Sequence, residues 1–112
     1  MAQPEYAHNL FTQNVTILSG AAVSSAVDTG GSRLVGFLTP ATVTNTAFDV
    51  QASFDRGITW VDVSSMSAIS APVSTLCAIN PADSACANYV RLQGSGNEGA
   101  DRTITLIFMK VA

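Results

Sequence analysis

Charged residues are scarce in this sequence. They make up 12% of its 112 residues, which is about half of the usual share in a soluble domain. A monomer with so few charges would expose a surface poor in charged groups to water, so we expect other chains to cover part of that surface. The net charge is −3 and the five cationic residues are scattered along the chain, which leaves no basic field for phosphate. The composition therefore predicts self-association or a larger assembly, and no nucleic-acid partner.

Histidine is nearly absent, and the one that occurs, His8, precedes the first predicted strand. A catalytic relay or a histidine general base would have to be built from the N-terminal segment. Alternation places Asp49 and Asp62 on one face of neighbouring strands, whereas glycoside hydrolysis needs two acids converging across a cleft. A solvated strand face explains these two acids as well. The sequence predicts no enzyme and no cofactor.

Cysteine is rare too, and the two cysteines, Cys77 and Cys86, flank residues 80–83. A bridge across so short a connection is possible if the two flanking segments run side by side. The alternative is two buried thiols that act as small apolar residues. A zinc site needs four ligands as a rule, and two thiols together with one distant histidine do not provide them. The oxygen-bearing side chains of Asn97, Glu98 and Asp101 suit calcium in principle, but loops of this composition are ordinary, and no metal is predicted.

Long apolar runs are missing. No run approaches the roughly 20 residues that span a bilayer, and the first residues, Met-Ala-Gln-Pro-Glu-Tyr, lack the basic and apolar regions of a signal peptide. The sequence therefore predicts neither a membrane protein nor export through such a signal. With 112 residues the chain is one domain, large enough to bury roughly two thirds of its unfolded surface without a metal or disulfides.

Alternation of apolar and polar residues is the main pattern that is present. It predicts strands at residues 14–18, 22–27, 33–38, 47–54, 59–63, 73–79, 88–93 and 102–109. Turn signals separate them about every ten residues, and no amphipathic helix is evident. This pattern predicts an all-β fold, a single-domain, jelly-roll-like β-sandwich of about eight antiparallel strands, with immunoglobulin-like topology as the alternative. Residues 1–13 are polar and aperiodic, and they are predicted to be an N-terminal arm ahead of a domain at 14–112.

Several strands have a clear inner face. The side chains predicted to lie in the core of the fourth and last strands are Phe48, Val50, Ala52, Phe54, Ile104, Leu106 and Phe108. Residues 33–38 are apolar on both faces, which is typical of a central strand. Within them, Gly36 is predicted to mark a bulge or a close approach of another backbone.

The stretch Ser53-Phe54-Asp55-Arg56-Gly57-Ile58-Thr59-Trp60 joins two predicted strands with the turn chemistry of a β-hairpin. Its spacing, Ser-x-Asp-x-Gly-x-Thr-Trp, resembles the Asp-box, a hairpin signature of sialidase propellers and many unrelated β proteins. The resemblance implies a structural turn in which Ser53 and Asp55 bond to turn backbone and Gly57 takes a conformation that side chains forbid. We predict that Trp60 packs in the core. The alternative is an exposed Trp60 that stacks on a ligand.

Four parts of the chain carry a wider resemblance, namely residues 33–40, 48–60, 80–92 and 101–106. They resemble the small β-sandwich proteins encoded among the structural genes of tailed bacteriophages, and within the third part the resemblance is carried by residues 80–83 and 89–92. The resemblance implies a virion component, made in the host cytoplasm. This would be a non-enzymatic capsid decoration (cement) protein that binds the assembled head and stabilises it by bridging subunits, or a piece of a fibre or tail. It implies a homotrimer with an arm laid on the shell, and the major capsid protein or another virion protein as partner.

Apolar side chains of the arm and of the last strand would make the contacts between chains. They are Tyr6, Leu10, Phe11, Ile107 and Met109. The alternative function is a carbohydrate-binding β-sandwich module of a phage fibre or tail, because jelly rolls bind glycans through an exposed aromatic and polar side chains on one sheet face. In that case Trp60, Gln51 and Asp62 would form the platform.

Overall fold

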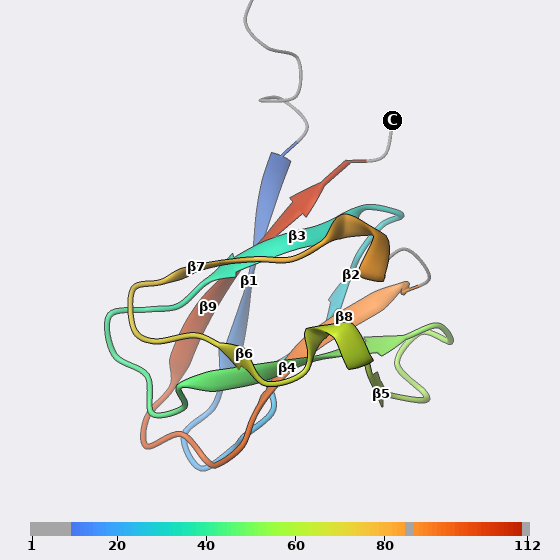
Figure 1. Cartoon of the computed structure of the whole chain (residues 1–112). Coiled ribbons are helices and arrows are strands. Elements are labelled where there is room, and N and C mark those ends of the chain that lie inside the picture. The colour runs from blue at the N-terminus through green and yellow to red at the C-terminus, as the bar shows by residue number, and fades with distance from the viewer. Residues whose placement is uncertain (1–9, 85–86, 111–112) are drawn as a thin grey trace, which may run out of the picture.

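The computed structural model describes residues 10–84 and 87–110, which form two antiparallel sheets packed as one compact domain (Figure 1). The first sheet contains, in order, β1 (Leu10–Ile17), β9 (Arg102–Met109), β3 (Arg33–Leu38) and β7 (Leu76–Ala78). The second contains β2 (Val27–Asp28), β8 (Tyr89–Gly94), β4 (Ala47–Ser53) and β5 (Val61–Asp62), and β6 (Ile69–Ser70) also pairs with β4. The 3-10 helices η2 (Ser64–Met66) and η3 (Pro81–Ser84) lie in connections. Among these residues no helix is long and apolar enough to cross a membrane.

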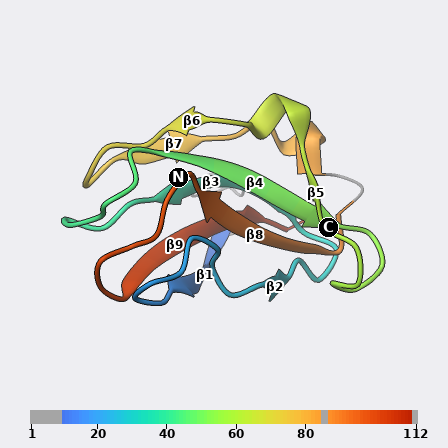
Figure 2. The ribbon, with the colours of Figure 1, turned by 90° about the horizontal axis from the view of Figure 1, so that it is seen from below.

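The strand pairings are nested. β4 pairs with β5 and β6, β3 with β7, β2 with β8, and β1 with β9. The chain is therefore one long hairpin rolled up so that successive pairs alternate between the two layers seen in Figure 2, which is the topology of a jelly roll. The predicted fold class is confirmed. Nine strands are described where about eight were predicted, because β5 and β6 share one position beside β4.

The hydrophobic core lies between the two sheets. Phe37 of β3 and Phe48 of β4 meet edge to face with ring centroids 6.1 Å apart, so they join the two layers directly. Both are fully buried, and the predicted inner faces of β4 up to Ala52 and of β9 are confirmed. Phe54 is the exception, since β4 ends at Ser53 and the Phe54 side chain is 65% exposed in the turn that follows. Alternation stops where the strand stops, so the prediction of a core Phe54 was wrong.

Gly36 has the role that the sequence predicted for it. The register of β3 against β9 shifts between Leu34 and Gly36, which is a β-bulge. A Cβ atom on Gly36 would lie 2.7 Å from the backbone carbonyl oxygen of Cys77 in β7. β3 lies between β9 and β7, so its central position is confirmed as well.

The boundary between arm and domain needs a correction. β1 begins at Leu10 and pairs with β9 over its whole length, so Leu10, Phe11, Thr12 and Gln13 belong to the sheet and not to an arm. Their alternation is weak because the outer end of β1 is exposed on both faces except at Phe11. Residues 1–9, with Tyr6 and His8, lie outside the described residues.

Two other predicted segments differ from the structure. The strand predicted at residues 22–27 is reduced to β2 and an isolated bridge between Val23 and Gln93. Residues 64–72, predicted as a loop, contain η2 and β6, and they bury Met66 in the core. Cys77 is buried and free, with its sulfur 3.6 Å from the carbonyl oxygen of Ser70. Cys86 lies outside the described residues.

Candidate functional site

The turn between β4 and β5 is held by its own side chains. Ser53 Oγ accepts a hydrogen bond from the amide of Gly57 (2.7 Å) and donates one to Asp55 Oδ1 (2.8 Å). Asp55 Oδ1 also accepts from the amide of Thr59 (2.9 Å), and this bond holds the pKa of Asp55 below its ordinary value. Gly57 has a φ of 87°, in the left-handed region that favours glycine. These residues therefore build a turn, and the likeness to the Asp-box stays a resemblance of local pattern.

Trp60 lies at the end of this turn, outside the core. Its side chain is half-buried, and the guanidinium carbon of Arg91 lies 4.2 Å from its ring centroid. Arg91 alternates in β8 with the buried Val90 and Leu92, so Trp60 covers the outer face of the second sheet. The prediction of a core Trp60 was wrong because β5 begins only at Val61. Alternation therefore does not govern the direction of Trp60.

A chain of polar side chains crosses the outer face of the same sheet. Gln51 of β4 accepts a hydrogen bond at Oε1 from Arg91 Nε (2.8 Å). Its Nε2 donates to Asp62 Oδ1 (3.0 Å) and to Gln93 Oε1 (2.7 Å). We call Gln51, Trp60, Asp62, Arg91 and Gln93 the polar face. The structure thus brings together the three residues predicted as a glycan platform and adds two from β8.

Gln51 is a positioning residue in this arrangement. Its amide oxygen and nitrogen are both engaged with neighbouring side chains. Among the described residues, no hydrogen bond occupies the second carboxylate oxygen of Asp62, the Nη groups of Arg91 or the amide nitrogen of Gln93. Burial lowers the pKa of Arg91, and an arginine remains a cation at neutral pH. Fixed donors and acceptors beside a half-exposed indole ring are the chemistry that binds polyhydroxyl ligands.

The outer face of the first sheet is different, because it is almost without charge. Leu10 lies opposite Met109, and Thr12 lies opposite Ile107, so these residues of β1 and β9 are side by side. We call the outward residues of this sheet the uncharged face: Leu10, Thr12, Leu38, Leu76, Ala78, Thr105, Ile107 and Met109. Leu76 is 64% exposed and Leu10 is 51% exposed. In the described strands, Arg33 at the margin is the one charged residue that the register places on this face.

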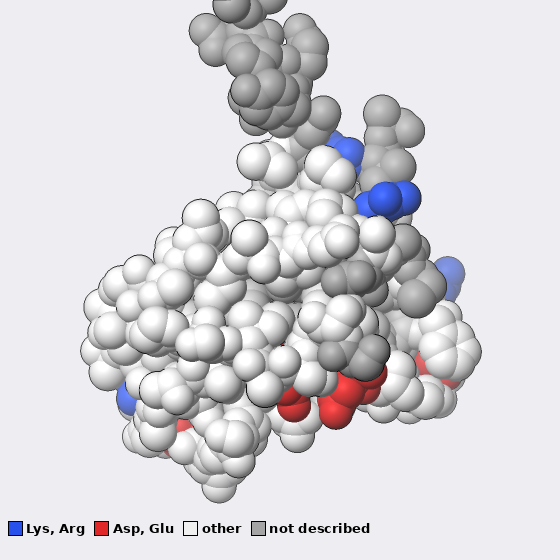
Figure 3. Space-filling model, in the orientation of Figure 1, with Lys and Arg blue, Asp and Glu red and all other residues white. Residues whose placement is uncertain are grey.

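The lack of charge extends beyond that sheet. Residues 63–82, which contain η2, β6 and β7, include no Asp, Glu, Lys or Arg. Figure 3 shows the side of the molecule that carries these segments almost wholly in white, with acidic residues gathered along its lower border. Of the residues predicted to contact other chains, Leu10, Ile107 and Met109 lie on the uncharged face.

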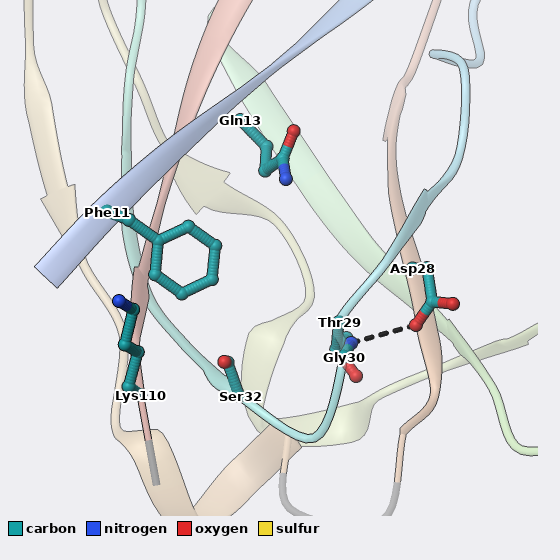
Figure 4. A pocket seen from close by; sticks show the side chains of 7 residues that line it. All are labelled: Phe11, Gln13, Asp28, Thr29, Gly30, Ser32 and Lys110. Atoms are coloured by element: carbon teal, nitrogen blue, oxygen red, sulfur yellow. Dashed lines mark hydrogen bonds between the residues drawn. The ribbon is translucent and has the colours of Figure 1, made fainter. Parts of the chain in front are cut away.

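Phe11, also predicted as such a contact, points to the other side of β1. Its ring stacks on Phe108 with centroids 5.4 Å apart, and Lys110 Nζ lies 5.9 Å from the Phe11 ring centroid. Phe11, Gln13 and Lys110 face the turn after β2 across an open pocket of about 420 Å³ (Figure 4). Among the described residues that line this pocket, Asp28 is the one acid and Lys110 the one base.

Glu98 is the most deeply buried acid in the described part of the chain, and no pattern in the sequence predicted its burial. The residue is 2% exposed. Oε1 accepts hydrogen bonds from the amide of Thr44 (2.8 Å) and from Arg102 Nε (3.0 Å). Oε2 accepts from the amide and the side chain of Asn45 (3.0 and 2.6 Å). Burial alone would raise the pKa of Glu98, but these hydrogen bonds lower it to about 2.

These contacts give the Gly-rich loop at residues 94–101 a structural role. The sequence predicted an ordinary loop here without a metal, whereas Glu98 anchors it to Thr44, Asn45 and Arg102. Both Glu98 oxygens are occupied by protein donors. Within residues 10–84 and 87–110, no three His, Cys, Asp or Glu side chains cluster as a metal site.

No protein-family model matches the chain, and no curated protein matches it in sequence. Its fold is similar to that of YomS. This protein, derived from the SPBc2 prophage, superposes with a TM-score of 0.58 at 12% identity over 90% of this chain and 95% of YomS. A second similar structure is a variant of chitosan-binding module 1 from a chitosanase/glucanase of Paenibacillus sp. IK-5, with a TM-score of 0.49 and 16% identity over 93% of this chain and 78% of that one. At this identity the likeness to YomS concerns the fold alone.

Proposed function

We propose that the chain is a non-enzymatic structural protein of a bacteriophage virion, and specifically a capsid decoration protein that binds the assembled head. The observation that carries the proposal is the uncharged face. On it, exposed Leu10 lies opposite Met109, exposed Leu38 and Leu76 lie opposite each other, and Ile107 of β9 lies between these two pairs. An exposed apolar patch on a small domain marks a surface that contacts other proteins. The resemblance to phage structural proteins gives the class of partner, and the YomS-like fold agrees with it.

Decoration needs a binding surface and no active site. A protein that binds the assembled shell and not the free subunits stabilises the shell by mass action. The uncharged face suits this task, because burying apolar side chains of β1, β3, β7 and β9 is favourable and requires no desolvation of charges in the described strands other than Arg33 at the margin.

The test is to add the purified chain to phage particles that lack it and to measure the bound protein by mass spectrometry. We expect Ile107→Lys combined with Leu76→Lys to reduce binding at least about tenfold, because two lysines would have to be desolvated at the contact. Ala100→Lys, at an exposed position on the loop before β9, adds one lysine away from the uncharged face and should bind like the wild type. Wild-type protein that does not bind particles, or a double variant that binds equally well, refutes the proposal.

The polar face supports a second candidate, a carbohydrate-binding module of a fibre or tail. The supporting observation is the set of side chains around Gln51, which hold Arg91, Asp62 and Gln93 in fixed positions beside Trp60. Pre-organised polar groups lose little conformational entropy when a ligand binds.

A glycan array of neutral and acidic oligosaccharides tests this candidate. If the wild type binds a glycan, Trp60→Ala should weaken that binding at least about tenfold, since a central aromatic carries a large share of binding energy. Phe54→Ala is the matched control, because it removes an exposed aromatic of the same turn that lies outside the polar face. A wild type that binds no glycan, or equal losses in the two variants, excludes the polar face as the binding site.

A further inference from the structure

β1 is an edge strand without the usual protection. It forms one margin of the first sheet, opposite β7 (Figure 2). Natural edge strands carry lysine, proline or a bulge, or are very short, because a free edge pairs with other strands. Leu10–Ile17 is eight residues long, contains no charged residue and no proline, and pairs with β9 in an unbroken register.

The direction of the backbone groups in β1 follows from contacts at its far end. The amide of Thr16 donates to Ser25 Oγ (3.1 Å) and its carbonyl oxygen accepts from the amide of Ser25 (3.0 Å), so both groups of Thr16 point away from β9. In a strand every second residue points the same way. Leu10, Thr12 and Asn14 therefore direct their N–H and C=O groups to the free edge, and no backbone hydrogen bond among the described residues occupies that side.

The contacts of Ser25 also set where a pairing strand must stop. Because Ser25 covers Thr16, the open part of the edge runs from Leu10 to Asn14. An identical strand that runs antiparallel uses all three outward residues in one register, with Thr12 opposite Thr12 of the partner subunit and Leu10 opposite Asn14 of the partner subunit. Each such pair exchanges two backbone hydrogen bonds.

We propose that the free edge of β1 pairs with β1 of a second copy of this chain, about a two-fold axis at Thr12, so that the two first sheets become one continuous sheet. The strand is self-complementary, because an uncharged segment meets no like charge in its copy. On the inner side, Phe11 would lie opposite Gln13 of the partner subunit. The partner strand would then form a wall of the pocket that Phe11, Gln13 and Lys110 line (Figure 4).

This inference stands on β1 alone and goes beyond the proposed function. A two-fold pair gives an even number of chains, in contrast to the homotrimer that the phage resemblance implies. Binding to particles can fail while the dimer stands, and a monomer can still bind particles, so the two tests have separate outcomes.

The test is light scattering across a concentration series, which should give the mass of a dimer for the wild type. Thr12→Lys places two lysines opposite each other at the axis and should raise the dimer dissociation constant at least about tenfold. Thr12→Pro removes an N–H that pairs with nothing in the monomer, so the fold should persist while the dimer is lost. Thr103→Lys is the matched control, since Thr103 is exposed on the same sheet face but lies on β9, one strand from the edge, and it should remain a dimer.

A covalent test fixes the register. Thr12→Cys places two thiols on Cα atoms about 5.5 Å apart, which a disulfide can span, so mild oxidation should link the chains as dimers. Thr103→Cys should not link them. A wild type that stays monomeric or forms a trimer, or a Thr12→Pro dimer as tight as the wild type, overturns the proposal.

Discussion

Replacing Glu98 with alanine should lower the free energy of unfolding by about 3–5 kcal/mol, because it breaks a buried ion pair and leaves the other charge without its partner. Arg102 would lose the carboxylate 3.0 Å from its Nε, and the amides of Thr44 and Asn45 would lose their acceptors. Such a loss is a large part of the total stability of a small domain, which is about 5–15 kcal/mol. Chemical denaturation at neutral pH measures it.

The pH dependence gives a sharper version of the same experiment with Glu98→Gln. The folded protein holds the pKa of Glu98 at about 2, below its ordinary value of 4.5. The stability that this carboxylate contributes is therefore fully present above pH 4.5 and is lost as the pH falls towards 2. By linkage it amounts to about 3 kcal/mol. The gap in stability between wild type and Glu98→Gln should narrow by that amount between pH 5 and pH 2.

Asp101→Asn provides the control for this pair of variants. Asp101 is an exposed acid of the same loop, and its Oδ1 accepts one hydrogen bond, from the amide of Ser19 (2.8 Å). Its replacement should cost about 1 kcal/mol or less. The buried carboxylate does not anchor the loop if Glu98→Ala is no less stable than Asp101→Asn. The same follows if the difference in unfolding free energy between the wild type and Glu98→Gln is equal at pH 5 and pH 2.

The sequence predicts the jelly roll because apolar and polar residues alternate in β4, β8 and β9. β3 and β9 have the predicted bounds, and Phe48, Ile104 and Phe108 lie in the core. The two-residue strands β2 and β6 were misjudged, because a pairing of two residues has no period to detect. Glu98 was missed for a related reason. Its burial depends on Thr44 and Asn45, which are distant in sequence and meet the loop only in the folded chain.

In the candidate sites too, alternation within a strand could be predicted from the sequence, whereas contacts that depend on strand order could not. Alternation placed Gln51 and Asp62 on one face, and their hydrogen bond is observed. Arg91 and Gln93 could be added only once β8 was known to lie beside β4, since strand order cannot be derived from one sequence. The free edge of β1 was hidden too, because whether a strand is an edge depends on the whole sheet.

Replacing Gly36 with alanine should cost about 2–3 kcal/mol, because the new Cβ would lie 2.7 Å from the carbonyl oxygen of Cys77. This oxygen belongs to the backbone of β7, so no side-chain rotation relieves the clash. β7 has only three residues and forms the other edge of the first sheet. We therefore expect β7 to move away from β3, at the cost of the pairings of Gly36 with Ala78 and of Phe37 with Cys77.

The thiol of Cys77 reports this movement. It is buried in the wild type, and burial raises its pKa, so it should react slowly with a thiol reagent. In a Cys86→Ser background, Gly36→Ala should make Cys77 react faster as well as lower the denaturation midpoint. Gly99→Ala is the matched control, because the nearest atom to its new Cβ is Thr44 Oγ1 at 3.9 Å, an ordinary contact. Equal stability and equal Cys77 reactivity in the two alanine variants would mean that β3 and β7 separate without cost, and that Gly36 is not required where the two backbones meet.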